Sequence, residues 1–180
     1  GNSESFAYDA EGNLVSASNN AVTMLFTYDA LNRLTSKTLT NWGKSISYSY
    51  DDAGNRTAML DPDGGTTQYQ YDGNNRLTQL TDPAGNTTSF TYDAAGRMTQ
   101  QTNGNGTYVQ YYYDDADRVD SVVHRDAGGS VLLRFGYTYD ARGNRLSMTD
   151  LSGTHQYSYD GSYRLDSVSY PGGDFEYFLY

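Results

Sequence analysis

The segment Tyr69–Arg97, YQYDGNNRLTQLTDPAGNTTSFTYDAAGR, contains the same pattern twice and decides the fold. An aromatic-x-Tyr-Asp phrase stands at Tyr69 to Asp72 and again at Phe90 to Asp93. Each phrase is followed by a short Gly/Asn/Ala stretch and then by Arg. A phrase that returns at a fixed interval predicts an internal repeat.

The phrase recurs along the whole chain. Its second Tyr stands at positions 8, 28, 50, 71, 92, 113, 139, 159 and 180, so the intervals are 20, 22, 21, 21, 21, 26, 20 and 21 residues. The first eight are followed directly by Asp. The expected signature of the repeats is therefore Tyr8, Asp9, Tyr28, Asp29, Tyr50, Asp51, Tyr71, Asp72, Tyr92, Asp93, Tyr113, Asp114, Tyr139, Asp140, Tyr159 and Asp160.

Each repeat contains two turn signals. The first lies between Asp and an Arg found five or six residues after Tyr, replaced by Asn13 in the first repeat, and its Gly and Asn residues permit positive φ. The second follows about ten residues later and is clearest in Asp61-Pro-Asp-Gly64 and Asp82-Pro-Ala-Gly85. In the longest interval, Tyr113 to Tyr139, we expect a longer hairpin or a bulge around Asp126–Gly129.

Short segments of period-two alternation lie between the turns. In Ile46-Ser-Tyr48-Ser-Tyr50 the aromatic residues fall on one face and Ser on the other, which is typical of a β-strand. Consecutive strands joined by short turns pair antiparallel. We therefore predict an all-β fold, a repetitive antiparallel β-hairpin meander of about sixteen to eighteen strands, with the Tyr rows as its packing face.

Composition agrees with this reading and excludes several functions. Leu, Ile, Val and Phe together number only 29 of 180 residues, a level at which disorder competes with folding, but 19 Tyr supply large flat surfaces to bury. The net charge of −10 argues against nucleic acid as a partner. No apolar run is long enough to insert into a membrane, and the absence of Cys excludes disulfides and thiolate sites.

The phrases Tyr92-Asp-Ala-Ala-Gly-Arg-Met98 and Asp82-Pro-Ala-Gly-Asn-Thr-Thr88 resemble the YD repeats of the Rhs (rearrangement hot spot) family, found in bacterial polymorphic toxins, toxin-complex shell proteins and teneurins. The resemblance covers essentially the whole chain. It implies a long strip of antiparallel sheet that spirals into a hollow shell, in which a toxin or another cargo is enclosed and from which it is delivered. It also implies a secreted or cell-surface protein.

The resemblance does not carry a catalytic role to this chain. Family members that cleave themselves have a distinct region with Asp-Pro motifs after the repeats, whereas Asp61-Pro62 and Asp82-Pro83 lie in ordinary repeat turns. Eight equivalent Asp residues favour a shared structural role, in which each Asp starts a turn and accepts backbone N–H groups and the following Arg. We therefore expect a non-enzymatic protein without catalytic residues, bound metal or cofactors.

Two other interpretations of these residues are a calcium site and a glycan-binding surface. Asp51, Asp52, Asn55, Asp61 and Asp63 are oxygen ligands of the kind that calcium prefers, but their spacing fits no calcium loop. The Tyr rows and Trp42 also suit an extracellular glycan-binding or adhesion module, which is the alternative function. His124 and His155 have no second His and no Cys near them in sequence, so we expect them to be ordinary sheet residues.

Residues 1–180 are interpreted as one YD-repeat array of about eight repeats, and we expect it to be a segment of a longer chain. Its expected partners are further YD repeats of the same or neighbouring chains and an enclosed toxin.

Overall fold

A computed structural model describes residues 3–180 and contains seventeen β-strands and one short 3-10 helix, η1 (Thr40–Trp42). The chain divides into two compact units, Gly1–Thr88 and Ser89–Tyr180. The first contains β1 (Ser5–Tyr8), β2 (Leu14–Ser18), β3 (Thr23–Tyr28), β4 (Leu34–Leu39), β5 (Lys44–Tyr50), β6 (Arg56–Leu60), β7 (Thr66–Tyr71) and β8 (Leu77–Thr81). β9 (Thr87–Tyr92) spans the boundary in sequence.

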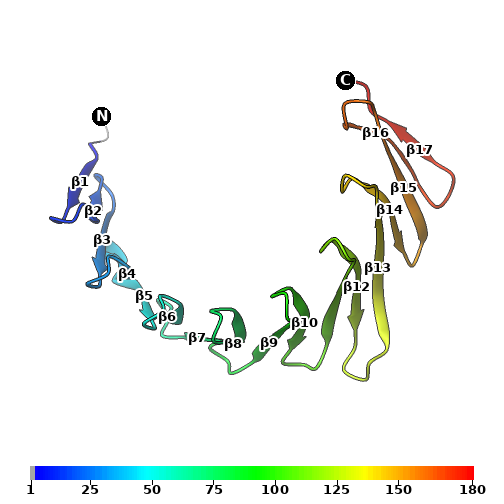
Figure 1. Ribbon diagram of the computed structural model, residues 1–180. Coiled ribbons are helices and arrows are strands. Elements are labelled where there is room, and N and C mark those ends of the chain that lie inside the picture. The colour runs from blue at the N-terminus through cyan, green and yellow to red at the C-terminus, as the bar shows by residue number, and fades with distance from the viewer. Residues whose placement is uncertain (1–2) are drawn as a thin grey trace. The chain divides into compact units, whose positions relative to one another are not determined.

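The second unit contains β10 (Met98–Asn103), β11 (Tyr108–Tyr113), β12 (Val119–Arg125), β13 (Val131–Tyr139), β14 (Arg145–Asp150), β15 (Gly153–Tyr159), β16 (Leu165–Ser169) and β17 (Phe175–Tyr177). Within each unit every strand pairs antiparallel with the next one along the chain (Figure 1). The predicted all-β hairpin meander is confirmed. No helix within residues 3–180 has the length and apolar character needed to cross a membrane.

The first turn of each repeat has one geometry throughout. The N–H of Asp114 donates to the carbonyl of Arg118 (2.9 Å), and the N–H of Asp117 donates back to the carbonyl of Asp114 (3.0 Å). Because the residue three positions after Asp must adopt positive φ, this place is occupied by Gly12, Asn32, Gly54, Asn75, Gly96, Asp117, Gly143 and Tyr163. A one-residue bulge follows on the outgoing strand, as where Tyr113 pairs with Val119 but Tyr112 pairs with Ser121.

The two faces of each strand differ as the alternation predicts. In β7, Tyr69 and Tyr71 are half-buried, whereas Gln68 and Gln70 are exposed. In five repeats the first aromatic residue of the phrase lies opposite an apolar residue of the following strand: Tyr48 opposite Met59, Tyr69 opposite Leu80, Tyr111 opposite Val122, Tyr137 opposite Met148 and Tyr157 opposite Val168. In the second repeat Phe26 lies opposite Lys37. The other face carries hydroxyl pairs such as Thr138 and Ser147, 2.7 Å apart.

Burial is shallow on both faces. Among residues 3–180 the only buried apolar side chains are Ala17, Val123 and Val168. The Tyr rows thus form a packing face, as expected, but each ring keeps part of its surface in solvent. Stability must therefore depend strongly on the polar contacts at the turns.

The long interval between Tyr113 and Tyr139 is accommodated by longer strands. β12 and β13 have seven and nine residues, and the Asp126–Ser130 turn that joins them has the same hydrogen bonds as the other turns. A bulge lies beside this turn, where Arg125 pairs with Val131 but His124 pairs with Leu133. The hairpin is therefore longer and bulged, as the interval predicts.

Candidate functional site

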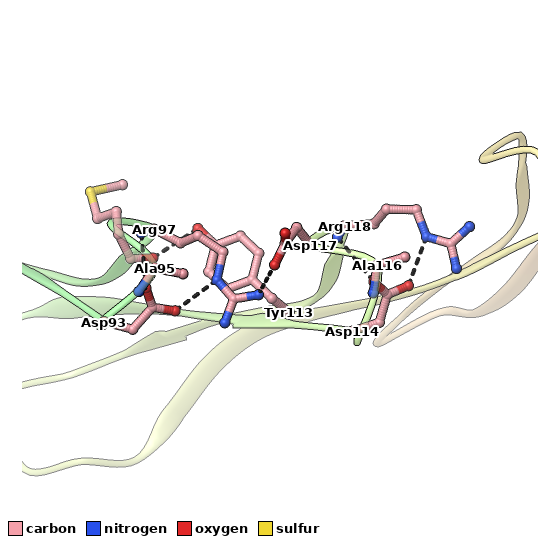
Figure 2. A network of polar contacts seen from close by, with 9 residues as sticks. Asp93, Ala95, Arg97, Tyr113, Asp114, Ala116, Asp117 and Arg118 are labelled. Atoms are coloured by element: carbon pink, nitrogen blue, oxygen red, sulfur yellow. Dashed lines mark hydrogen bonds and ion pairs between the residues drawn. The ribbon is translucent and has the colours of Figure 1, made fainter.

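The repeated Asp carboxylate is bound within its own turn. In the turn that begins at Asp114, Oδ1 accepts the N–H groups of Ala116 (2.9 Å) and Arg118 (3.0 Å), and Oδ2 accepts the Nε–H of Arg118 (2.7 Å). Figure 2 shows this turn beside the equivalent turn at Asp93. Both oxygens are used to hold the turn.

These hydrogen bonds lower the pKa of the carboxyl groups. For Asp114 the backbone N–H of Arg118 is the main cause, opposed by desolvation and helped by the Arg118 side chain. For Asp51 the side-chain amide of Asn55 is the main cause of the lowered pKa. An Asp with a lowered pKa is ionised at neutral pH, which suits an acceptor of turn hydrogen bonds better than a proton donor.

The partner of Oδ2 always stands four residues after Asp, but it is of two kinds. It is Arg in the turns that begin at Asp29, Asp72, Asp93, Asp114 and Asp160, and it is Asn in those that begin at Asp9, Asp51 and Asp140. The sequence grouped Arg56 and Arg145 with the other arginines, but each stands one residue later. They lie instead over the rings of Tyr69 (4.6 Å from the centroid) and Tyr157 (4.2 Å).

In six phrases the second Tyr ties its repeat to the preceding one. Its hydroxyl donates to the main-chain carbonyl at the start of the preceding repeat's outgoing strand. The bonds run from Tyr28 to Leu14 (2.9 Å), Tyr50 to Leu34 (2.8 Å), Tyr71 to Arg56 (3.0 Å), Tyr113 to Met98 (2.8 Å), Tyr139 to Val119 (2.8 Å) and Tyr159 to Arg145 (2.9 Å).

The turn arginines contact the same Tyr from the preceding repeat. Their guanidinium groups lie over the ring, and the distances to the centroid are 4.7 Å for Arg33 and Tyr50, 4.7 Å for Arg97 and Tyr113, 4.7 Å for Arg118 and Tyr139, and 4.6 Å for Arg164 and Tyr180. One Arg therefore joins its own Asp to the aromatic ring of the next repeat, through an ion pair and a cation–π contact.

Successive turns also contact each other directly, and the contact depends on the residue at positive φ. Where that residue is Asn or Asp, its side chain accepts from the preceding turn, as Asn32 does from Asn13 (2.8 Å), Asn75 from Asn55 (2.8 Å) and Asp117 from Arg97 (2.5 Å). Where it is Gly, the preceding Arg donates to a backbone carbonyl instead, as Arg33 does to Asp51 and Arg118 does to Asp140 (both 2.8 Å). Sequence reasoning missed this coupling, although the Asn or Arg four residues after Asp is its signal.

The second turns lie close together in the same way. A Cβ added at Gly65 would lie 2.8 Å from Cβ of Pro83, and one added at Gly153 would lie 2.7 Å from Cβ of Pro171. Only glycine fits these positions without displacing the neighbouring turn.

The residues considered for calcium do not converge on one site. Asp51 binds its own turn and Asn55, whereas Asp63 pairs with Lys44. Within residues 3–180 no group of three or more His, Cys, Asp or Glu side chains is placed to hold a metal ion. His155 lies 3.4 Å from a carboxylate oxygen of Asp150 and edge-on to Tyr170, a contact that its isolation in sequence did not predict.

Comparison with known proteins gives a family match and a fold match. The model of the RHS Repeat family matches residues 8–41, 28–66, 50–87, 71–108 and 92–131. The matches end at residue 131, yet the turns at Asp140 and Asp160 have the same hydrogen bonds as those before them. A search of curated protein sequences finds no match.

Among solved structures, the Photorhabdus luminescens Tc holotoxin pore is similar, with a TM-score of 0.79, 19% identity and coverage of 92% of this chain. Two crystal structures titled TcdB2-TccC3 and TcdB2-TccC3-Cdc42 give TM-scores of 0.78 and 0.77 at 19% identity, again with 92% of this chain covered. The chain spans 10% of the length of each of these structures. At this identity the likeness shows the fold.

Proposed function

The chain belongs to the RHS-repeat family, and on that premise we propose that it is a structural segment of a secreted or cell-surface Rhs-type shell that encapsulates or delivers a toxin or another cargo. The observation that carries this proposal is that the repeated Asp, Tyr and Arg side chains hold the turns and join successive repeats. All eight signature Asp residues accept hydrogen bonds within their own turns, and the Tyr and Arg residues bind one repeat to the next.

The same observation supports a non-enzymatic role. A carboxylate that acts as a general base or a nucleophile must direct an oxygen at the substrate, and the oxygens of these carboxylates are hydrogen-bonded within their own turns. The same Asp role is also repeated in every first turn, which favours a structural use over a single active site.

The fold likeness supports membership in a larger assembly. Because the chain spans a tenth of the similar structures, we infer that residues 1–180 form one YD-repeat array within a longer protein, with further YD repeats as its neighbours. The toxin-associated names of those structures make a toxin the first cargo to test.

The test uses the native full-length protein with its cargo region. Limited proteolysis should leave the cargo region intact in the wild type and cleave it rapidly in a Tyr50→Ala/Tyr139→Ala variant, which loses two bonds between repeats. Trp42→Ala, in an exposed turn, is the matched control and should behave as wild type. Equal cleavage of the cargo region in the wild type and the double variant would contradict the proposal.

A further inference from the structure

Among the residues described, the side of β13 that faces β14 has no paired strand along Val131–Phe135, and this stretch is called the open edge of β13. On one side, β12 pairs with β13 from Val131 to Gly136, but on the other side β14 begins to pair only at Gly136. Within residues 3–180 no strand is paired with the β14 side of Val131–Phe135. At about 3.3 Å per residue, this open edge is roughly 16 Å long. Figure 1 shows β12 and β13 running past the end of the β14–β15 hairpin.

The direction of the backbone groups along this edge follows from the turn after β13. The N–H of Asp140 donates across to Asn144, so Asp140 faces β14. Hydrogen-bonding direction alternates along a regular antiparallel strand, so Arg134 shares the direction of Asp140, whereas Leu132 is the extra residue of the bulge, where the alternation is interrupted. The N–H and C=O groups of Arg134 therefore point toward the side where no strand is present, which is the arrangement that accepts an added strand.

The side chains of the open edge are unusually apolar for an exposed strand. Val131, Leu132 and Leu133 are 48%, 50% and 45% exposed. At the point where β14 ends, a recess of about 250 Å³ is lined by Arg134, Gly136, Thr149, Asp150 and Leu151, and Leu151 is itself exposed. An incoming strand would find apolar contacts along the edge and a recess at its end.

The charge at this edge selects the partner. The chain has twelve Lys and Arg residues, and eleven of them make an ion pair, a side-chain hydrogen bond or a ring contact. Arg134 is the twelfth, and residues 3–180 supply it with no such contact. It is exposed and lies on the open edge itself. Although the chain carries a net charge of −10, screening confines its field to about 8 Å at physiological salt, so a carboxylate beside Arg134 is attracted.

We propose that the open edge of β13, Val131–Phe135, is a docking site for an extended, apolar segment of a protein partner that adds as a strand and places a carboxylate opposite Arg134. Backbone hydrogen bonds to Arg134 hold the strand, and the ion pair sets its register. This surface does not depend on whether the protein encloses a cargo.

The experiment measures binding of two fluorescein-labelled peptides to the 180-residue chain by anisotropy in 0.15 M salt. Both peptides alternate Thr and Val over seven residues, and the central residue is Glu in one and Lys in the other. We expect the Glu peptide to bind about three- to fivefold more tightly, as one exposed ion pair allows. The Arg134→Glu variant should prefer the Lys peptide, whereas Lys37→Glu, the same charge change in the other unit, should keep the wild-type preference.

A second variant tests the edge rather than the charge. Arg134→Pro removes the outward N–H at an open edge that tolerates proline, whereas Arg134→Ala removes the charge alone, so Arg134→Pro should bind both peptides at least about tenfold more weakly than Arg134→Ala does. Circular dichroism and denaturant melts establish that each variant is folded. The proposal is overturned if neither peptide binds, if Arg134→Glu does not change the preference, or if Arg134→Pro abolishes only a concentration-dependent dimer, since the edge would then serve a second copy of this chain.

Discussion

The guanidinium group of Arg118 lies 4.7 Å from the ring centroid of Tyr139, although the two residues belong to successive repeats. The same Arg118 side chain donates its Nε–H to Asp114 and an Nη–H to the carbonyl of Asp140. One side chain thus binds its own turn, the next turn and the next aromatic ring. Because few side chains are fully buried in this sheet, contacts of this kind between repeats should account for much of its stability.

Replacing Arg118 tests this contact. Arg118→Ala should lower the free energy of unfolding by about 1–2 kcal/mol, because it removes a cation–π contact and hydrogen bonds to a carboxylate and a carbonyl. Arg134→Ala, which removes an arginine without such contacts, is the matched control and should change the free energy of unfolding by less than about 0.5 kcal/mol. Urea melts measure both. Equal effects would show that the contact in the turn adds nothing.

The hydroxyl of Tyr139 donates to the carbonyl of Val119 over 2.8 Å. Tyr139→Phe keeps the ring and removes this bond, so it should destabilise the chain by about 1 kcal/mol. Tyr112→Phe changes an exposed hydroxyl in β11 and should have a much smaller effect. Chemical denaturation of the two variants gives the comparison, and a larger loss for Tyr112→Phe would refute the role assigned to the Tyr139 hydroxyl.

Gly65 is required by the approach of the next second turn. Gly65→Ala places a methyl group against Asp61 and Pro83 and should cost about 1–3 kcal/mol, as overpacking does. Gly73→Ala is the control, because nothing lies within 4 Å of the added Cβ and its φ is not positive. It should be neutral or slightly stabilising. A thermal melt in which the two variants coincide would argue against close contact between these turns.

Tyr163 adopts φ of 62°, which is strained for a bulky side chain. The guanidinium carbon of Arg142 lies 4.2 Å from the centroid of the Tyr163 ring, but such an exposed cation–π contact contributes only about 0.5–1 kcal/mol. In two other repeats an Asn at this place accepts from the Asn of the preceding turn, and Asn144 stands at the corresponding donor position. We therefore expect Tyr163→Asn to stabilise the chain by about 0.5 kcal/mol, a balance between relieved strain and the lost ring contact.

The reciprocal change, Asn75→Tyr, should be destabilising, because it adds strain and removes the acceptor of Asn55. Denaturant midpoints of the two variants that shift in the same direction would contradict this account of the turn.

Acid should weaken the array through its turns. The pKa of Asp72, Asp114 and Asp160 lies below the ordinary value of 3.8, chiefly because of hydrogen bonds from Arg76, Arg118 and Arg164. A carboxyl group whose pKa is lowered on folding contributes stability above its unfolded pKa and loses it as the pH falls through the folded pKa. Stability should therefore be constant from pH 7 to about pH 5 and fall below about pH 4.

Urea midpoints between pH 7 and pH 3 measure this decline. Asp114→Asn should be less stable than wild type at pH 7 and should lose less stability on acidification, because its turn no longer depends on an ionised group. A decline that begins above pH 6 would assign the acid sensitivity to other residues.

The repeat pattern was sufficient to predict the strands and the turns. This followed because hairpin turns are local: Asp, the residue at positive φ and the Arg or Asn that closes the turn lie within five consecutive residues. The alternation of Tyr69 and Tyr71 with Gln likewise reflects the geometry of a single strand. These features need no knowledge of what lies beside the strand.

Contacts between repeats could be identified only in the tertiary structure. Arg33 and Arg56 look equivalent in sequence, but a one-residue difference places the first against Asp29 and Tyr50 and the second between Tyr48 and Tyr69. The open edge of β13 could not be predicted from the sequence either, because it depends on where the neighbouring β14 ends. Local dihedral preferences and period-two alternation are written in consecutive residues, whereas register and the lengths of adjacent strands emerge only when separate segments are placed side by side.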